Sequence, residues 1–265
     1  MKNTVDMELV DTHSHIYMPE FDVDRADVVA RAMETGVRTI ILPNVDLQTV
    51  EPMHRMCALY PEVCHPAMAL HPTEVREDYR QMLDAVERLF VQGRYVAVGE
   101  CGVDLYWDRT YRKEQMEVFA QHLRWASAFR LPVIIHCREA FDEVMQMVET
   151  MQDGSLSGVF HCFSGTPDEA RRVRDAGFML GIGGVVTYKK SQLPDVVRAV
   201  GLQGLLLETD APYLAPMPFR GRRNESAYVL SVAQKVAEAT GCAVETVADV
   251  TTRQAKAMFL WHNDL

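Results

Sequence analysis

The sequence lacks the features that mark membrane-spanning, secreted and disulfide-stapled proteins. None of its apolar runs approaches the roughly 20 residues needed to cross a bilayer. The first residues, MKNTVDMELVDTHSH, contain no apolar stretch of the kind found in a signal peptide. The six cysteines include no CxxC pair, and a chain of 265 residues can bury a core without staples. We therefore expect a cytoplasmic protein with reduced thiols and no membrane partner.

Positive charge and nucleotide-binding motifs are also scarce. The chain has 27 lysines and arginines against 37 aspartates and glutamates, a formal net charge of −10. This balance argues against a broad electrostatic grip on duplex DNA. No GxGxxG follows the first candidate strand, and GxxxxGK[ST] occurs nowhere. A polyanionic substrate would therefore need a local basic rim, with metal ions supplying positive charge at the centre.

What is present is a regular alternation of short apolar runs and longer amphipathic stretches, which favours βα units and a parallel sheet. Eight runs are predicted strands: ELVDTH, RTIILPN, PAMALHP, YVAVGE, PVIIHC, GVFHCF, FMLGIGG and LLLETD. Helices are predicted over residues 25–34, 79–90, 111–129, from Pro167 onward, 224–239 and 244–259. Since a (β/α)8 barrel occupies about 250 residues, we expect a single TIM-barrel domain over residues 1–265. A doubly wound sheet is the competing fold.

Six ionisable residues fall at the carboxyl ends of these predicted strands. They are His13, His15, Glu100, His136, His161 and Asp210. In a barrel these ends form one rim, where active sites are found. His13 and His15 are two residues apart on a strand, so their side chains share a face.

The mixture of imidazoles and carboxylates is typical of a metal site. A lone histidine is more simply a hydrogen-bonded core residue, but four histidines with two rim carboxylates favour metal binding. Burying carboxylates among imidazoles is costly unless a cation compensates. Six ligands exceed what one tetrahedral ion needs, so the set predicts two divalent ions, Mg²⁺, Mn²⁺ or Zn²⁺, with Glu100 and Asp210 also candidates for catalysis.

Two further side chains should point into the same rim because they lie two residues from a predicted ligand. Arg138 follows His136 and could bind phosphate oxygens in a fork, or form a structural salt bridge. Glu208 precedes Asp210 and could handle a proton, orient a ligand, or serve a structural role alone.

Candidate substrate contacts lie on the loops beyond the strands. His71 ends the third predicted strand. A basic run follows the eighth strand, where barrels often bind phosphate, and contains Arg220, Arg222 and Arg223. Tyr106 and Trp107 could stack on a base, although loop packing is an equally simple explanation.

Five motifs together resemble the signatures of the TatD family of metal-dependent deoxyribonucleases: VDTHSH, GECGVDLYW, PVIIHCREA, HCFSG and ETDAPYLAP. The resemblance runs from about residue 9 to the last predicted helix. It implies a TIM barrel that hydrolyses DNA with divalent metals, acting on single strands or 3′ ends. It also implies one ion on His13, His15 and Asp210, the other on His136 and His161, and Glu100 as the bridge.

Two other functions remain open from the residues alone. The same scaffold could cleave an ester or amide, such as the aminoacyl ester of a tRNA. Related amidohydrolases often bridge their metals with a modified lysine on the fourth strand, whereas this chain has Glu100 there and no lysine nearby. A non-enzymatic metal-binding protein is the second alternative, but open coordination positions would argue against it.

Overall fold

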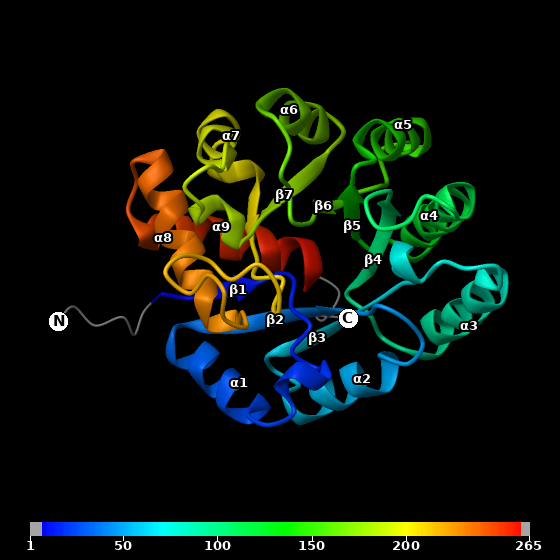
Figure 1. The fold of residues 1–265 in the computed structure, drawn as a ribbon, viewed down its shortest axis with the longest axis horizontal. Coiled ribbons are helices and arrows are strands. Elements are labelled where there is room, and N and C mark those ends of the chain that lie inside the picture. The colour runs from blue at the N-terminus through cyan, green and yellow to red at the C-terminus, as the bar shows by residue number, and fades with distance from the viewer. Residues whose placement is uncertain (1–6, 261–265) are drawn as a thin grey trace.

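Eight parallel strands form a barrel in the computed structural model, which describes residues 7–260 (Figure 1). The strands are β1 (Leu9–Asp11), β2 (Val37–Pro43), β3 (Cys64–Met68), β4 (Ala97–Asp104), β5 (Val133–Arg138), β6 (Gly158–Phe160), β7 (Phe178–Ile182) and β8 (Leu205–Leu207). They are ordered β1 to β8, and Thr12 after β1 donates its N–H to the Leu207 carbonyl at 3.0 Å. The predicted TIM barrel is confirmed, and the doubly wound sheet is excluded.

Helices surround the barrel. The ring consists of α1 (Arg25–Glu34), α2 (Val50–Leu59), α3 (Tyr79–Gln92), α4 (Arg112–Phe129), α5 (Phe141–Met151), α6 (Pro167–Asp175), α7 (Leu193–Val200) and α8 (Val229–Thr240) (Figure 1). Short 3-10 turns span Pro19–Phe21, Pro72–Glu74, Gly184–Thr187, Leu202–Gly204 and Ser226–Tyr228. Helix α6 begins at a capping box, in which Thr166 and Glu169 bond each other's backbone, with Pro167 at its first position. None of the helices among residues 7–260 is long and apolar enough to cross a membrane.

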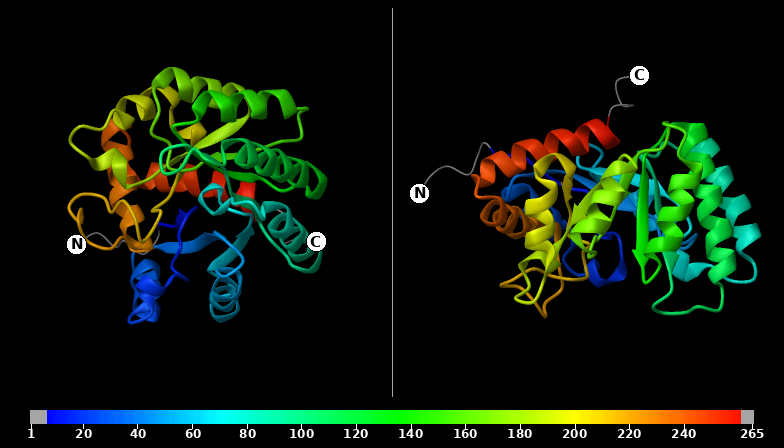
Figure 2. Two further views of the ribbon diagram at one scale, coloured as in Figure 1. Left: turned by 45° about the vertical axis from the view of Figure 1, so that its right-hand side comes forward. Right: turned by 90° about the horizontal axis from the view of Figure 1, so that it is seen from above.

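Alternation along the strands divides the apolar core into two layers. In β2, Ile40 and Leu42 pack outward against the helices, and Ile41 packs into the barrel. Helix α9 (Val244–Phe259) contributes Ala255 and Phe259 to the inner layer. Figure 2 shows α9 on the side of the barrel opposite to the loop after β8. This helix covers the amino-terminal end of the strands, so the carboxyl end is left for a site.

The structure corrects two details of the prediction. The helix predicted over residues 224–239 begins only at Val229, because Asn224 and Glu225 are buried in the preceding loop and bonded to other segments. Glu100 does not end β4, which continues to Asp104 after a register shift between Val98 and Cys101. The thiols of Cys101 and Cys137 pack against the outer core, and all six cysteines are free.

Candidate metal centre

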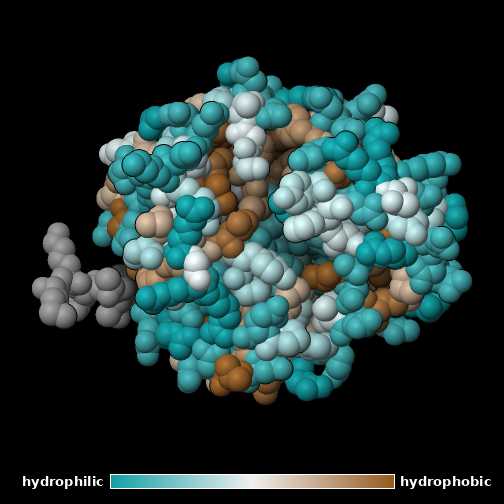
Figure 3. Space-filling view, in the orientation of Figure 1, coloured by the Kyte–Doolittle hydropathy of each residue, from teal (hydrophilic) through white to brown (hydrophobic). Residues whose placement is uncertain are grey.

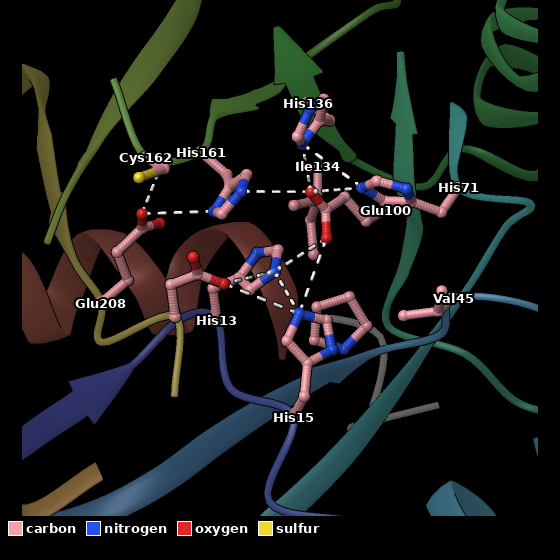
Figure 4. A network of polar contacts seen from close by, with 12 residues as sticks. His13, His15, Val45, His71, Glu100, Ile134, His136, His161, Cys162 and Glu208 are labelled. Carbon is pink, nitrogen blue, oxygen red and sulfur yellow. Dashed lines mark hydrogen bonds and ion pairs between the residues drawn. The ribbon is translucent and has the colours of Figure 1, made fainter. Parts of the chain in front are cut away.

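The six predicted ligands converge at the carboxyl end of the barrel. The first group contains His13, His15 and Asp210. His13 Nε2 lies 3.1 Å from His15 Nε2, and Asp210 Oδ1 lies 3.8 and 3.7 Å from these two atoms. Figure 4 shows the imidazole rings from several strands pointing toward one another around Glu100.

Glu100 lies between this group and a second one. Its Oε2 atom is 3.0 Å from His13 Nε2 and 3.7 Å from His15 Nε2. Its Oε1 atom is 2.7 Å from His136 Nδ1 and 3.1 Å from His161 Nε2. One carboxylate therefore presents a separate oxygen to each group, which is the arrangement expected of a ligand shared by two cations.

His71 was predicted to contact substrate, and the structure brings it to the second group. Its Nε2 atom lies 3.2 Å from Glu100 Oε1 and 3.3 Å from His136 Nδ1. Among the described residues, the atoms of His71, Glu100 and His136 are close enough to hold one ion. His71 is thus placed either to bind a cation or to hydrogen-bond a group beside it.

The hydrogen bonds behind the histidines show that this donor set fits metal ions. The Tyr17 hydroxyl donates to the Pro43 carbonyl at 2.6 Å, so it must accept the proton of His15 Nδ1 at 2.9 Å. This fixes the tautomer of His15 and leaves a lone pair on Nε2, which faces the other ligands. His136 is held in the same way: Asp104 Oδ2 lies 2.9 Å from its Nε2, so Nδ1 faces Glu100.

Burial and mutual charge shift the pKa values of the cluster. Burial lowers the pKa of His13 well below its usual range and that of His15 to about 4. Burial also raises the pKa of Asp210 to about 7. For Glu100 burial acts upward, but His161, His71 and His13 outweigh it and hold its pKa well below the usual range. For His161 burial acts downward, but Glu100 and Glu208 outweigh it and hold its pKa well above the usual range. The neutral His13 and His15 beside the ionised Glu100 are in the protonation states that metal binding requires, whereas a cation at His161 would displace a proton.

The remaining histidines behave differently. His122 is buried on α4, where Nδ1 bonds the Val118 carbonyl and Nε2 accepts the Leu70 N–H. His54 bonds the hydroxyl of Tyr95 at 3.1 Å. These rings have structural partners and lie outside the cluster.

Asp104 is a buried carboxylate beside the cluster that was not predicted from the sequence. It is buried at the end of β4, and besides holding His136 it accepts the N–H groups of Tyr106 and Trp107 at 3.0 and 3.1 Å through Oδ1. Burial raises its pKa, but bonds from His136 and Trp107 outweigh this and lower it overall. The available signal was its position four residues after Glu100 on one strand.

Two other missed residues hold the turn that carries Asp210. Buried Asp11 accepts the backbone N–H and the hydroxyl of Thr209 at 2.8 and 2.6 Å. Asn224 donates to the carbonyls of Thr209 and Tyr213 at 2.7 and 2.6 Å. Asp210 adopts a φ of 58°, which these bonds on either side stabilise.

Glu208 lies behind His161, with Oε1 at 3.3 Å from its Nδ1 and 2.5 Å from the Cys162 N–H. The Glu208 carboxylate fits there because residue 181 on β7 is glycine and has no side chain. A Cβ at Gly181 would lie 2.3 Å from Glu208 Oε2 and 3.1 Å from the His161 Cα.

We predict that Gly181→Ala displaces Glu208 and lowers activity roughly 10- to 100-fold, because His161 loses the partner that orients it. Gly183→Ala is the matched control, since a Cβ there meets Glu208 only at 3.7 Å, an ordinary contact. Activity and thermal unfolding of both variants give the comparison. Equal activity in the two variants would show that the position of Glu208 is unimportant.

The four predicted arginines have different surroundings. Arg138 lines a cavity of about 480 Å³ together with His15, His71, Glu100, His136, His161 and Asp210. Figure 3 shows that the face drawn there is hollowed near its middle, with apolar side chains among hydrophilic ones. Arg220 lies over the ring of Tyr188, and neither it nor Arg222 lines this cavity.

Arg223 is held by a different group. Its guanidinium contacts Asp24 at 2.7 Å and donates to the Glu20 carbonyl at 2.6 Å. Its neighbour Glu225 is paired with Arg31 at 2.6 Å. The basic loop after β8 is thereby fastened to α1 and the segment before it, and it is not part of the ligand cluster.

Tyr17 offers a test of how the centre is built. We predict that Tyr17→Phe weakens cation affinity about 10- to 100-fold, because His15 loses the acceptor that fixes its tautomer. Tyr95→Phe is the matched control, as it removes a hydroxyl from a tyrosine–histidine pair outside the cluster. Titration calorimetry gives the affinities, and NMR of the imidazole nitrogens gives the tautomer. An unchanged affinity and an unchanged His15 tautomer would contradict this role for Tyr17.

A TIM barrel with buried imidazoles and carboxylates gathered at the carboxyl ends of its strands defines the class of barrel-type metal-dependent hydrolases. The comparisons with known proteins narrow this class. A model of the TatD related DNase family matches residues 10–260. The chain belongs to the TatD family of metal-dependent hydrolases.

Individual relatives agree with this assignment. The chain is 34% identical over 252 residues to the uncharacterized metal-dependent hydrolase YabD of Bacillus subtilis, covering 95% of this chain and 98% of that protein. It is 31% identical over 246 residues to the 3′-5′ ssDNA/RNA exonuclease TatD of Shigella flexneri, covering 91% and 94%. The crystal structure of YJJV, a TatD homologue from Escherichia coli K12, superimposes with a TM-score of 0.85 at 30% identity, covering 95% and 97%.

Proposed function

We propose that this protein is a divalent-cation-dependent phosphodiesterase that cleaves single-stranded nucleic acid from the 3′ end, with DNA as its main substrate. The observation that carries the proposal is the placement of Glu100, whose two oxygens face two groups of histidines in one cavity with Arg138. The similarity to a 3′-5′ ssDNA/RNA exonuclease supports this choice of substrate.

In this proposal each side chain has a defined role. His13, His15 and Asp210 would hold one cation, His136 and His161 would hold the other, and Glu100, which turns one oxygen toward each group, would be shared by both. When bound, a pair of divalent cations supplies Lewis-acid stabilisation for both the attacking and the leaving oxygen of a phosphodiester. Side chains of the protein carry out proton transfer, orient the ligands and bind the phosphate.

Asp210 accepts the proton of the attacking water. Its Oδ1 faces His13 and His15 and its carboxyl group lines the cavity, where an ionised carboxylate can take up a proton from water. Glu208 keeps His161 oriented, and Asp104 does the same for His136. Arg138 binds the non-bridging oxygens of the phosphate, and His71 donates a hydrogen bond beside them. Arg220, Arg222 and Arg223 are proposed only as contacts for the more distant phosphates of a strand.

A substrate panel tests the proposal. Purified protein is first freed of metal and then supplied with Mg²⁺, Mn²⁺ or Zn²⁺. It is offered 3′- or 5′-labelled single-stranded DNA, duplex DNA, an aminoacyl-tRNA ester and simple amides. We expect cation-dependent shortening of single strands from the 3′ end. Cleavage of the ester or the amides without any cleavage of nucleic acid would overturn the proposal in favour of a different hydrolase.

A further inference from the structure

Exposed apolar side chains gather on two loops at the carboxyl end of the barrel. Among residues 7–260, ten large apolar side chains remain exposed, and five of them lie on these two loops. They are Tyr106, Trp107, Tyr213, Leu214 and Met217. A cluster of exposed apolar side chains is typical of a binding site. Trp107 is 68% exposed and Tyr213 is 48% exposed, and both line the cavity of the candidate metal centre. Aromatic rings with open faces are stacking surfaces for other flat groups.

These two rings belong to opposite walls of the cavity. Trp107 follows β4 and Tyr213 follows β8, and strands four apart in an eight-stranded barrel lie across its axis. In Figure 1, β4 lies on the right of the barrel, and the loop after β8, in gold and orange, lies on its left. The candidate ligands are therefore situated between the two rings.

Trp107 is attached to the second ligand group. Asp104 accepts its backbone N–H through one oxygen and holds His136 through the other. Tyr106 packs edge-to-face on Trp107 at 4.9 Å, and the Arg138 guanidinium lies 3.8 Å over the Tyr106 ring and 5.3 Å from the Trp107 ring. The backbone of Trp107 is thus held relative to His136, and its indole is in contact with Tyr106 and Arg138.

Tyr213 is attached to the first ligand group. Its N–H donates to the Asp210 carbonyl at 2.8 Å, and its own carbonyl accepts from Asn224. Its ring lies 6.4 Å from that of His15, and its hydroxyl contacts Met18 at 3.7 Å. Each half of the centre therefore has its own aromatic platform, built into the same turn or hydrogen-bond network as a candidate ligand.

We propose that Trp107 and Tyr213 stack on the two nucleobases that flank the scissile phosphate, one base on each platform. This inference rests on the proposed function. Both rings line the cavity that contains the candidate ligands, so a phosphate held there would carry one base toward each ring, and base stacking is tolerant of sequence. In a duplex the neighbouring bases already cover these faces, so the substrate needs unpaired bases on both sides of the scissile bond.

The first test measures binding. A fluorescein-labelled single-stranded hexamer with phosphorothioate linkages, which resists cleavage, is titrated with protein and Mn²⁺, and anisotropy is recorded. We expect Trp107→Ala and Tyr213→Ala each to weaken binding roughly 10-fold or more, and Trp107→Phe and Tyr213→Phe to restore most of it. Leu59→Ala is the control, since Leu59 is 65% exposed on α2, outside the cavity lining. Wild-type affinity in both alanine variants would overturn the inference.

The second test asks which base each platform contacts. Oligonucleotides carrying an abasic sugar on one side or the other of the scissile bond should each lose about 10-fold in kcat/KM with the wild type. Trp107→Ala should then be insensitive to one abasic position and Tyr213→Ala to the other.

The outcomes separate the two proposals. Cleavage of the normal and both abasic strands at equal rates by the wild type would overturn the stacking platforms and leave the nuclease function standing. A wild type that cleaves no oligonucleotide with any of the three cations would overturn the nuclease function and the platforms together.

Discussion

Asp210→Asn and His136→Ala are expected to abolish cation-dependent hydrolysis, with losses on the order of 1,000-fold or more in kcat/KM. Asparagine keeps the size of Asp210 but cannot accept a proton, and it binds a cation more weakly than a carboxylate. Alanine at position 136 removes the Nδ1 atom that lies 2.7 Å from Glu100 and leaves Asp104 without its imidazole partner. Steady-state kinetics on single-stranded DNA give the loss for each variant.

Matched variants separate this loss from unfolding. Asp249→Asn removes a carboxylate that is paired with Arg253 on α9, at the opposite end of the barrel. His54→Ala removes a histidine that bonds Tyr95 outside the cluster. Both controls should keep activity within about 3-fold of the wild type, since surface changes usually act on stability by less than ~0.5 kcal/mol. Substantial hydrolysis by a folded Asp210→Asn or His136→Ala protein would refute the proposed centre.

Removing the cations should lower thermal stability by a large amount. A ligand present at about 1,000 times its dissociation constant stabilises the folded state by roughly 4 kcal/mol. In a protein of this size that corresponds to a shift of the unfolding temperature on the order of 10 °C. The shift arises because the folded chain brings the ligands together, with His13 Nε2, His15 Nε2 and Asp210 Oδ1 within 3.8 Å of one another, whereas the unfolded chain has no such site.

Differential scanning calorimetry with EDTA, and then with Mn²⁺ or Zn²⁺ in excess, measures this shift. Glu100→Gln provides the internal comparison, because it removes charge from the only carboxylate that faces both ligand groups among the described residues. This variant should lose most of the cation-dependent shift while unfolding cooperatively in EDTA. Identical unfolding temperatures with and without cations in the wild type would contradict a built metal centre.

The barrel and the ligand cluster were predictable because each depends on a short-range pattern. Strand alternation alone places His13 and His15 on one face, and parallel strands bring His136 and His161 to one edge. The thiols of Cys101 and Cys137 pack in the outer core for the same reason, one residue after a ligand. Such arguments need only the period of a strand and the direction of its neighbours.

The residues that support the ligands were harder to predict because their partners are distant in the chain. Asp11 bonds Thr209 across 198 positions, and Tyr17 reaches the Pro43 carbonyl through a hydroxyl whose direction no local pattern fixes. Glu100 stands in the middle of β4 because a register shift lengthens that strand. These features follow from the closure of the barrel and can only be read from its three-dimensional form.

The loop after β8 shows a further limit of sequence reasoning. A run of arginines beyond a barrel strand is typical of a phosphate site, but charge alone does not show which carboxylates are near. Asp24 lies 199 positions from Arg223 and holds its guanidinium through two bonds. The side chain of Arg138, by contrast, stays in the cavity because Tyr106 supports it.

The packing of α9 against the barrel affects how the protein folds and which of its parts can be altered. Phe259 and Ala255 complete the inner apolar layer, so that layer stays open to water until α9 packs against the barrel. Loss of α9 would expose Val10, Ile41 and their neighbours and favour aggregation. The rim at the other end, with its aromatic loops, shares none of this packing. Its loops can therefore be altered to change the ligand without disturbing the packing of α9 at the amino-terminal end of the strands.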